Sequence, residues 1–114
     1  MDDRARHLFS LFGEQSIVVS TWGASHFHRL ARNKGIYFQT SGNRHRGLVK
    51  VRYNDIEDNY NIVYIPNGRG NVFEQKGVKE EDLINELSDK IGQSPFVLDL
   101  FLDMYLIYYG YGRE

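Results

Sequence analysis

Lysine and arginine, whose side chains bind phosphate, are concentrated in one acid-free part of this sequence. Residues 15–54 contain no aspartate or glutamate, yet they carry seven of the fourteen Lys and Arg residues. These seven are Arg29, Arg32, Lys34, Arg44, Arg46, Lys50 and Arg52. From residue 55 onward the balance reverses, with twelve acids against five bases. Because a surface of one sign attracts partners of the opposite sign, this pattern predicts binding of nucleic acid through phosphate contacts.

Strand alternation gives part of this basic segment a common face. Lys50 and Arg52 are two apart, so in a strand they point to the same side of the sheet. Tyr37 would lie on a neighbouring strand, and Tyr37 or Trp22 could add stacking on bases. Two alternatives remain open. The bases could pair with the protein's own acids at residues 55–58 and 80–89, or opposed patches could pair two molecules head to tail.

Two weaker groups of residues have spacings found in catalytic or metal sites. His26 and His28 would share a face of an extended segment, with His45 as a third ligand, but no carboxylate is near them in the sequence. Glu74 and Lys76, with Asp58 upstream, have the spacing of metal-dependent nucleases. The histidines form a weak signal and are more often solvated or hydrogen-bonded, and the Glu-x-Lys spacing arises often by chance, so we predict no metal site and no cofactor.

The hydrophobic pattern predicts a single α+β domain spanning residues 1–114. A first helix should cover residues 5–12, capped by Asp2 or Asp3 and ended by Gly13. Apolar or alternating runs then predict strands, which short turns should join into an antiparallel meander. The predicted strands lie at residues 17–22, 36–40, 49–53, 60–65 and 72–75. An amphipathic helix at 80–91 follows, so we expect four to five strands with helices on one face, in the order α-β-β-β-β-β-α-α.

The last part of the chain predicts an unusually apolar helix. In residues 96–109 the polar positions are Asp99 and Asp103, and the rest are apolar or tyrosine. A helix that is apolar nearly all round is buried on several sides, either in its own core or against a partner. Its tyrosines and one that follows are candidate interface residues, which makes a homodimer or a protein partner the alternative prediction. They are Tyr105, Tyr108, Tyr109 and Tyr111.

Composition narrows the classes further. The chain has 114 residues and no cysteine, so it has no disulfides, no thiolate chemistry and no cysteine-ligated zinc. The polar N-terminal residues are unlike a signal peptide, and the run at 96–109 is too short and too charged to cross a bilayer. We therefore expect a cytoplasmic protein that does not enter the membrane.

A local motif resembles the HicA family of small toxin ribonucleases, which pair a Gly-Ser-His element with α-β-β-β-α order. The counterpart here is Gly23-Ala24-Ser25-His26, with one residue inserted between glycine and serine. The resemblance covers about twenty residues and implies that His26 would act as a general acid or base on an RNA phosphodiester.

Residues 20–91 also resemble a group of small uncharacterised proteins of phages and integrated elements. The shared elements are Trp22-Gly23-Ala24 with Phe27, Gly35-Ile36-Tyr37-Phe38, the strands at 49–54 and 58–62, and Gly77-Val78 opening a helix. The sequence departs from this pattern at Asn59, where threonine is usual. The resemblance implies an α+β fold and a phage or mobile-element context, but it supplies no activity. Together these features favour a non-enzymatic nucleic-acid-binding protein, with a protein-interaction or inhibitor module as the alternative and a ribonuclease third.

Overall fold

Five antiparallel strands form one sheet in which each strand pairs with its neighbours in the sequence. The computed structural model describes residues 3–94, and the predicted helix at 96–109 lies outside this range. The sheet order is β1-β2-β3-β4-β5. The strands are β1 (Ser25–Arg29), β2 (Gly35–Ser41), β3 (Arg46–Asn54), β4 (Asn59–Pro66) and β5 (Phe73–Val78). The predicted α+β class and antiparallel meander are therefore confirmed.

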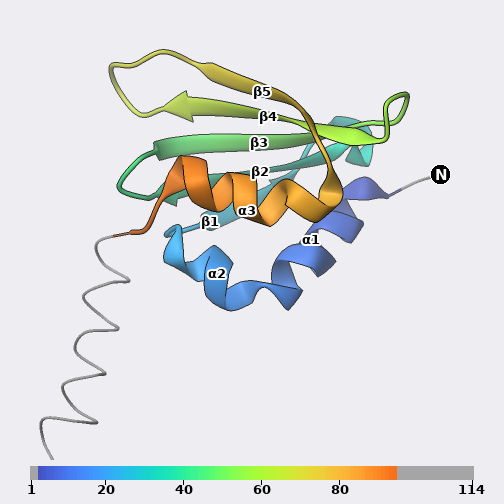
Figure 1. Cartoon of the computed structure of the whole chain (residues 1–114), viewed down its shortest axis with the longest axis horizontal. Coiled ribbons are helices and arrows are strands. Elements are labelled where there is room, and N and C mark those ends of the chain that lie inside the picture. The colour runs from blue at the N-terminus through green and yellow to red at the C-terminus, as the bar shows by residue number, and fades with distance from the viewer. Residues whose placement is uncertain (1–2, 95–114) are drawn as a thin grey trace, which may run out of the picture.

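Three α-helices cover the same face of this sheet (Figure 1). They are α1 (Arg4–Glu14), α2 (Ser16–Thr21) and α3 (Glu80–Ile91), and a short 3-10 turn, η1 (Ala31–Asn33), joins β1 to β2. Each long helix buries an apolar stripe at helical spacing: Ala5, Leu8 and Phe12 in α1, and Leu83, Leu87 and Ile91 in α3. The predicted cap of α1 is confirmed at Asp3, whose side chain accepts a hydrogen bond from the Arg6 backbone N–H.

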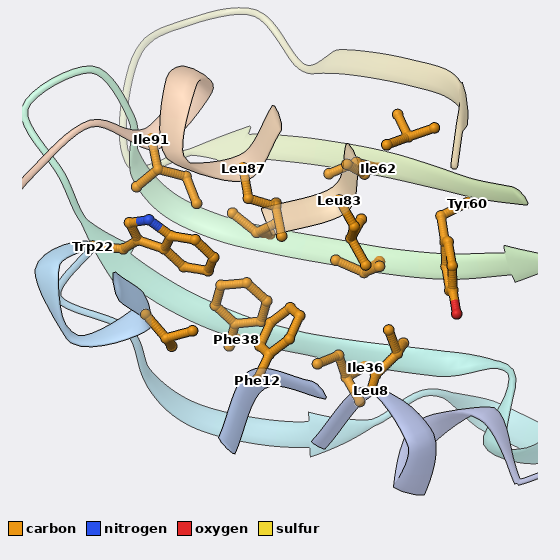
Figure 2. Close-up of a cluster of buried hydrophobic side chains, with 14 of the residues drawn as sticks. Leu8, Phe12, Trp22, Ile36, Phe38, Tyr60, Ile62, Leu83, Leu87 and Ile91 are labelled. Atoms are coloured by element: carbon orange, nitrogen blue, oxygen red, sulfur yellow. The ribbon is translucent and has the colours of Figure 1, made fainter. Parts of the chain in front are cut away.

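The core lies between these helices and alternate residues of the central strands. Val49 and Val51 of β3, and Tyr60 and Ile62 of β4, are almost completely buried. Figure 2 shows Phe12, Trp22 and Phe38 side by side in this layer. The Phe12 ring meets those of Trp22 and Phe38 edge-on at 5.9 and 5.7 Å, an arrangement that aromatic quadrupoles favour.

One predicted strand is wrong. Residues 17–22 were expected to be extended, but Ser16–Thr21 forms helix α2, and the first strand is Ser25–Arg29. Val19 and Trp22 are three residues apart and both are buried, so a helical turn carries both into the core. Ile17 is left 75% exposed. β-Branched residues disfavour a helix only slightly, so tertiary packing can decide the conformation here.

The C-terminal end of α3 is fixed against the β2–β3 hairpin by main-chain hydrogen bonds. The backbone N–H groups of Arg44 and His45 both donate to the Ile91 carbonyl, at 3.0 and 3.1 Å. Gly92 ends the helix at φ 75°, and a Cβ there would collide with the Asn43 side chain. This contact holds α3 at a fixed position across the sheet.

The corrected helix can be tested by comparing two apolar truncations. Leu87→Ala removes a fully buried side chain and should lower the free energy of unfolding by about 2–5 kcal/mol. Ile17→Ala should change it by no more than about 0.5 kcal/mol, because Ile17 is exposed and alanine favours a helix. Urea unfolding followed by circular dichroism measures both. A loss at Ile17 as large as that at Leu87 would contradict the helical placement.

Candidate nucleic-acid interface

The face of the sheet opposite the helices carries basic, aromatic and aliphatic side chains. Because Gly47, Val49 and Val51 of β3 are buried, the alternate residues Arg46, Leu48, Lys50 and Arg52 point to the other side. We call this side of the sheet the open face, since none of the described helices covers it. Its strand residues include Tyr37 and Gln39 of β2, Asn61, Val63 and Ile65 of β4, and Glu74 and Lys76 of β5.

The strand register places these side chains in rows across the sheet. Lys50 lies between Tyr37 and Val63, and Val63 pairs in turn with Glu74. Arg52 lies between Gly35 and Asn61. Directly opposed residues of an antiparallel pair have Cβ atoms about 4.5–5.5 Å apart, so Lys50 and Tyr37 are neighbours. Arg52 lies two residues further along β3 on the same side, roughly 7 Å from Lys50.

A hollow of about 400 Å³ lies on the open face around these rows. Lys50, Arg52, Asn61 and Val63 line it from the two central strands, and Glu74 lines it from β5. Leu30, Ala31 and Lys34 line it from the connection between β1 and β2. The hollow therefore combines three cationic side chains and one carboxylate with apolar surface.

Three cations of the open face have no acid beside them. Within residues 3–94, Arg46, Lys50 and Arg52 make no ion pair and no side-chain hydrogen bond. Lys34 at the rim does have a partner, since its Nζ lies 3.3 Å from Asp55 Oδ2. The carboxylate of Glu74 lies 3.3 Å from Lys76 Nζ. On this side the strands carry four cations and one carboxylate, so their side chains give the open face a net positive charge. The cations are Arg46, Lys50, Arg52 and Lys76, and the carboxylate is Glu74.

Two of the other predicted bases, Arg29 and Arg44, do not join this group. Arg29 points toward α1, where its Nη1 donates to both carboxylate oxygens of Asp3 at 2.8 and 3.0 Å. Arg44 contacts the end of α3, donating to the Asp89 carbonyl at 2.9 Å and lying 3.3 Å from Asp89 Oδ1. Arg32 lies in η1 with a left-handed backbone, φ 59°. The alternative, in which basic residues pair with the protein's own acids, therefore holds for Arg29, Lys34 and Arg44.

Of the two aromatic candidates for stacking, the structure leaves one accessible. Tyr37 is half-buried on the open face, and its ring stacks on that of His28 with centroids 5.0 Å apart and an interplanar angle of 21°. Trp22 is fully buried, and its indole N–H donates to Ser88 Oγ at 3.1 Å. The prediction that Trp22 could stack on a partner is therefore wrong, because its ring belongs to the core.

The three histidines are used separately. His26 has a φ of 55° at a bulge in β1, and its Nδ1 lies 2.9 Å from Ser25 Oγ. His28 stacks on Tyr37, and His45 Nε2 lies 3.2 Å from the Leu48 carbonyl. No group of three or more histidine or acidic residues that could hold a metal ion occurs among residues 3–94. The role of His26 implied by the ribonuclease resemblance stays a prediction.

Of the residues with nuclease-like spacing, Asp58 lies apart from the other two. Glu74 and Lys76 lie on the open face of β5 and pair with one another. Asp58 lies in the β3–β4 turn with φ 52°, where it accepts a hydrogen bond from the Tyr53 hydroxyl at 2.6 Å. The predicted interface tyrosines, Tyr105, Tyr108, Tyr109 and Tyr111, lie outside the described residues.

A polar cluster that the sequence did not reveal joins α1, β4 and α3 on the helical side of the sheet. The Tyr60 hydroxyl donates to Glu80 Oε1 at 2.8 Å, and His7 Nε2 lies 2.6 Å from the same oxygen. Arg4 Nη1 is 3.3 Å from the Tyr60 hydroxyl and 3.6 Å from Glu80 Oε1. The contacting pairs are 20 to 76 positions apart in the sequence, so no local spacing could have revealed them. The acidic first turn of α3 was the one available signal.

The cluster changes the titration of its members in ways that favour a structural role. Desolvation opposes ionisation of Glu80, but hydrogen bonds from Tyr60 and His7 outweigh it and hold the pKa of Glu80 below its ordinary value of 4.5. Burial, together with the hydrogen bond to Glu80, raises the pKa of Tyr60 above its usual range. Tyr60 thus remains a donor at neutral pH, and the carboxylate it binds remains ionised.

In comparisons with known proteins, no family model, curated protein or solved structure matches this chain. Among residues 3–94, no helix has the length and apolar character needed to cross a bilayer.

The Glu80 cluster predicts a specific pH dependence of stability. Because the folded-state pKa of Glu80 is lowered, its contribution is complete above the unfolded pKa and is lost as pH falls through the folded pKa. Glu80→Gln should therefore destabilise the protein at pH 7 and have less effect near pH 3. The loss in free energy of unfolding caused by Glu80→Gln at pH 7 should stay below about 1 kcal/mol, because the Glu80 side chain is 44% exposed and solvent screens the interaction.

Glu81→Gln is the matched control, since Glu81 lies in the same helical turn and shares its macrodipole effect. Urea unfolding at several pH values measures both variants. Equal losses in the two variants at pH 7 would show that the hydrogen bonds to Glu80 contribute nothing beyond the helix dipole.

Proposed function

We propose that this protein binds nucleic acid on the open face of its sheet and that it does so without catalysing a reaction. The observation that supports this most directly is the row of Arg46, Lys50 and Arg52 along β3. These cations share one side of the central strand, and none has an acidic partner within residues 3–94. Unpaired cations on an uncovered surface are the groups that neutralise phosphates.

Phosphate neutralisation and base contact would occupy different parts of the same face. Lys50 and Arg52 would contact the backbone, and release of its counterions would supply much of the affinity. Tyr37 offers an aromatic edge next to Lys50, while Leu48, Val63 and Ile65 offer aliphatic surface. Arg29 and Arg44 are left out of this surface, because their guanidinium groups bind Asp3 and Asp89.

We also propose that the protein is cytoplasmic and that it comes from a phage or another mobile element. The absence of cysteine is compatible with a reducing compartment. The resemblance of residues 20–91 to small phage proteins favours a binding protein over a metabolic enzyme.

Salt and charge reversal test the proposal. With about three phosphates neutralised on a single strand, the affinity should fall roughly 18-fold between about 50 and 200 mM monovalent salt. Reversing charge with Lys50→Glu and Arg52→Glu should weaken binding further and flatten the salt dependence. Fluorescence anisotropy with labelled mixed-sequence DNA and RNA measures both effects.

Lys79→Glu is the control for net charge, because Lys79 is exposed at the start of α3, on the covered side of the sheet. It should leave the affinity nearly unchanged. Absence of binding at low salt to every nucleic acid tried, or equal losses in the Lys79 and Lys50 variants, would refute the proposal.

A further inference from the structure

The width of the open face limits its access to the bases of a duplex. Neighbouring strands are about 4.8 Å apart, so five strands span roughly 19 Å. The major groove of B-form DNA is about 12 Å wide and admits a helix or a two-stranded ribbon. A five-stranded sheet cannot enter it, and the three described α-helices all lie on the other side, where they cannot reach a groove facing the open face.

The side chains of the open face also suit unpaired bases. Tyr37 and His28 form a stack of two rings across β2 and β1, with centroids 5.0 Å apart. On its other side Tyr37 pairs with Lys50 across β2 and β3. A base added to the exposed part of this stack would have a cation beside it for the adjoining phosphate. In a duplex the base faces are covered by neighbouring pairs, so stacking of this kind requires an unpaired strand.

The hollow on the open face is the second feature that fits a splayed nucleotide. It offers the ammonium of Lys50 and the guanidinium of Arg52 to a phosphate, and the side chains of Leu30 and Val63 to an apolar ring. Asn61 supplies an amide and Glu74 a carboxylate, which can accept hydrogen bonds from base amino groups. A duplex would keep these base edges paired and above the hollow.

We infer that the ligand of the open face is single-stranded nucleic acid, bound with at least one base stacked beside Tyr37 and its phosphates on Lys50 and Arg52. This inference rests on the proposed function and goes beyond it by naming the class of nucleic acid that is bound. It makes the sheet a platform for a single strand, in which charge holds the backbone and the aromatic stack holds a base.

The test compares strands and duplexes of the same sequence at one salt concentration. Oligonucleotides of about 12 nucleotides fall within the site sizes of roughly 4–16 nucleotides known for such platforms. Single-stranded DNA or RNA should bind the full-length protein roughly tenfold or more tighter than the matching DNA and RNA duplexes, which is the scale of one stacked base. Preference for either kind of single strand supports the inference.

The same measurements distinguish failure of this inference from failure of the proposed function. Duplex binding that equals or exceeds single-strand binding would overturn this inference and leave nucleic-acid binding intact. No binding to either form would remove the proposed function as well.

Substitution of Tyr37 tests the stacking directly. Tyr37→Ala should weaken single-strand binding by about 5- to 150-fold and should not alter any residual duplex binding. Tyr37→Phe keeps the ring and should bind like the wild type. Circular dichroism and urea unfolding show whether each variant is folded. Unchanged single-strand affinity in a folded Tyr37→Ala variant would show that the base does not stack there.

Discussion

The strict alternation of β3 is the constraint on which the rest of the molecule depends. One side of this central strand carries Gly47, Val49 and Val51, all buried, while Lys50 and Arg52 lie on the other. Because the side-chain period of a strand is two, a slip of one residue would turn both charges into the core and both valines into solvent. Burying unpaired cations costs several kcal/mol each, so the register is strongly determined.

The placement of the helices follows from this division. Their apolar stripes can be buried only against the valine side, so α1, α2 and α3 pack there together (Figure 1). The outer strands are protected in another way. β1 and β5 each have a neighbour on one side only, and both contain a bulge, near His26 and near Gly77. Bulges and charged side chains discourage sheet edges from pairing with other chains. The two edges of the described sheet are therefore poorly suited to pairing with a strand of another chain.

Sequence patterns predicted the parts of the fold that depend on local periodicity. Alternation located β2, β3 and β4, and the 3.6-residue stripe located α1 and α3. The pattern failed at residues 17–22, where a β-branched run suggested a strand. That segment is helical because Val19 and Trp22 must both reach the core, and this requirement depends on residues such as Phe38 and Ser88 far along the chain. The conformational propensities of residues 17–22 do not depend on these distant residues, so they cannot predict such packing.

For the candidate site, the sequence predicted the common face of Lys50 and Arg52 but not the partners of the other bases. Arg29 meets Asp3 across 26 positions, and Arg44 meets Asp89 across 45. Such pairs depend on where the helices dock. The Glu80 cluster was missed for the same reason, since its members come from α1, β4 and α3.

These pairings change what the charge segregation of the sequence means. The acids that follow residue 54 do not neutralise the basic segment evenly. Asp55 binds Lys34 at the rim of the open face, and Asp89 binds Arg44 at the hairpin. Arg46, Lys50 and Arg52, on the central strand, keep no acidic partner within residues 3–94. A surface of one sign attracts counter-charge from a distance. A chain with a net charge of −1 can therefore still present a positive face, because within residues 3–94 Glu74 is the one acid on the strands of that face and many of the other acids lie on α3, on the covered side of the sheet.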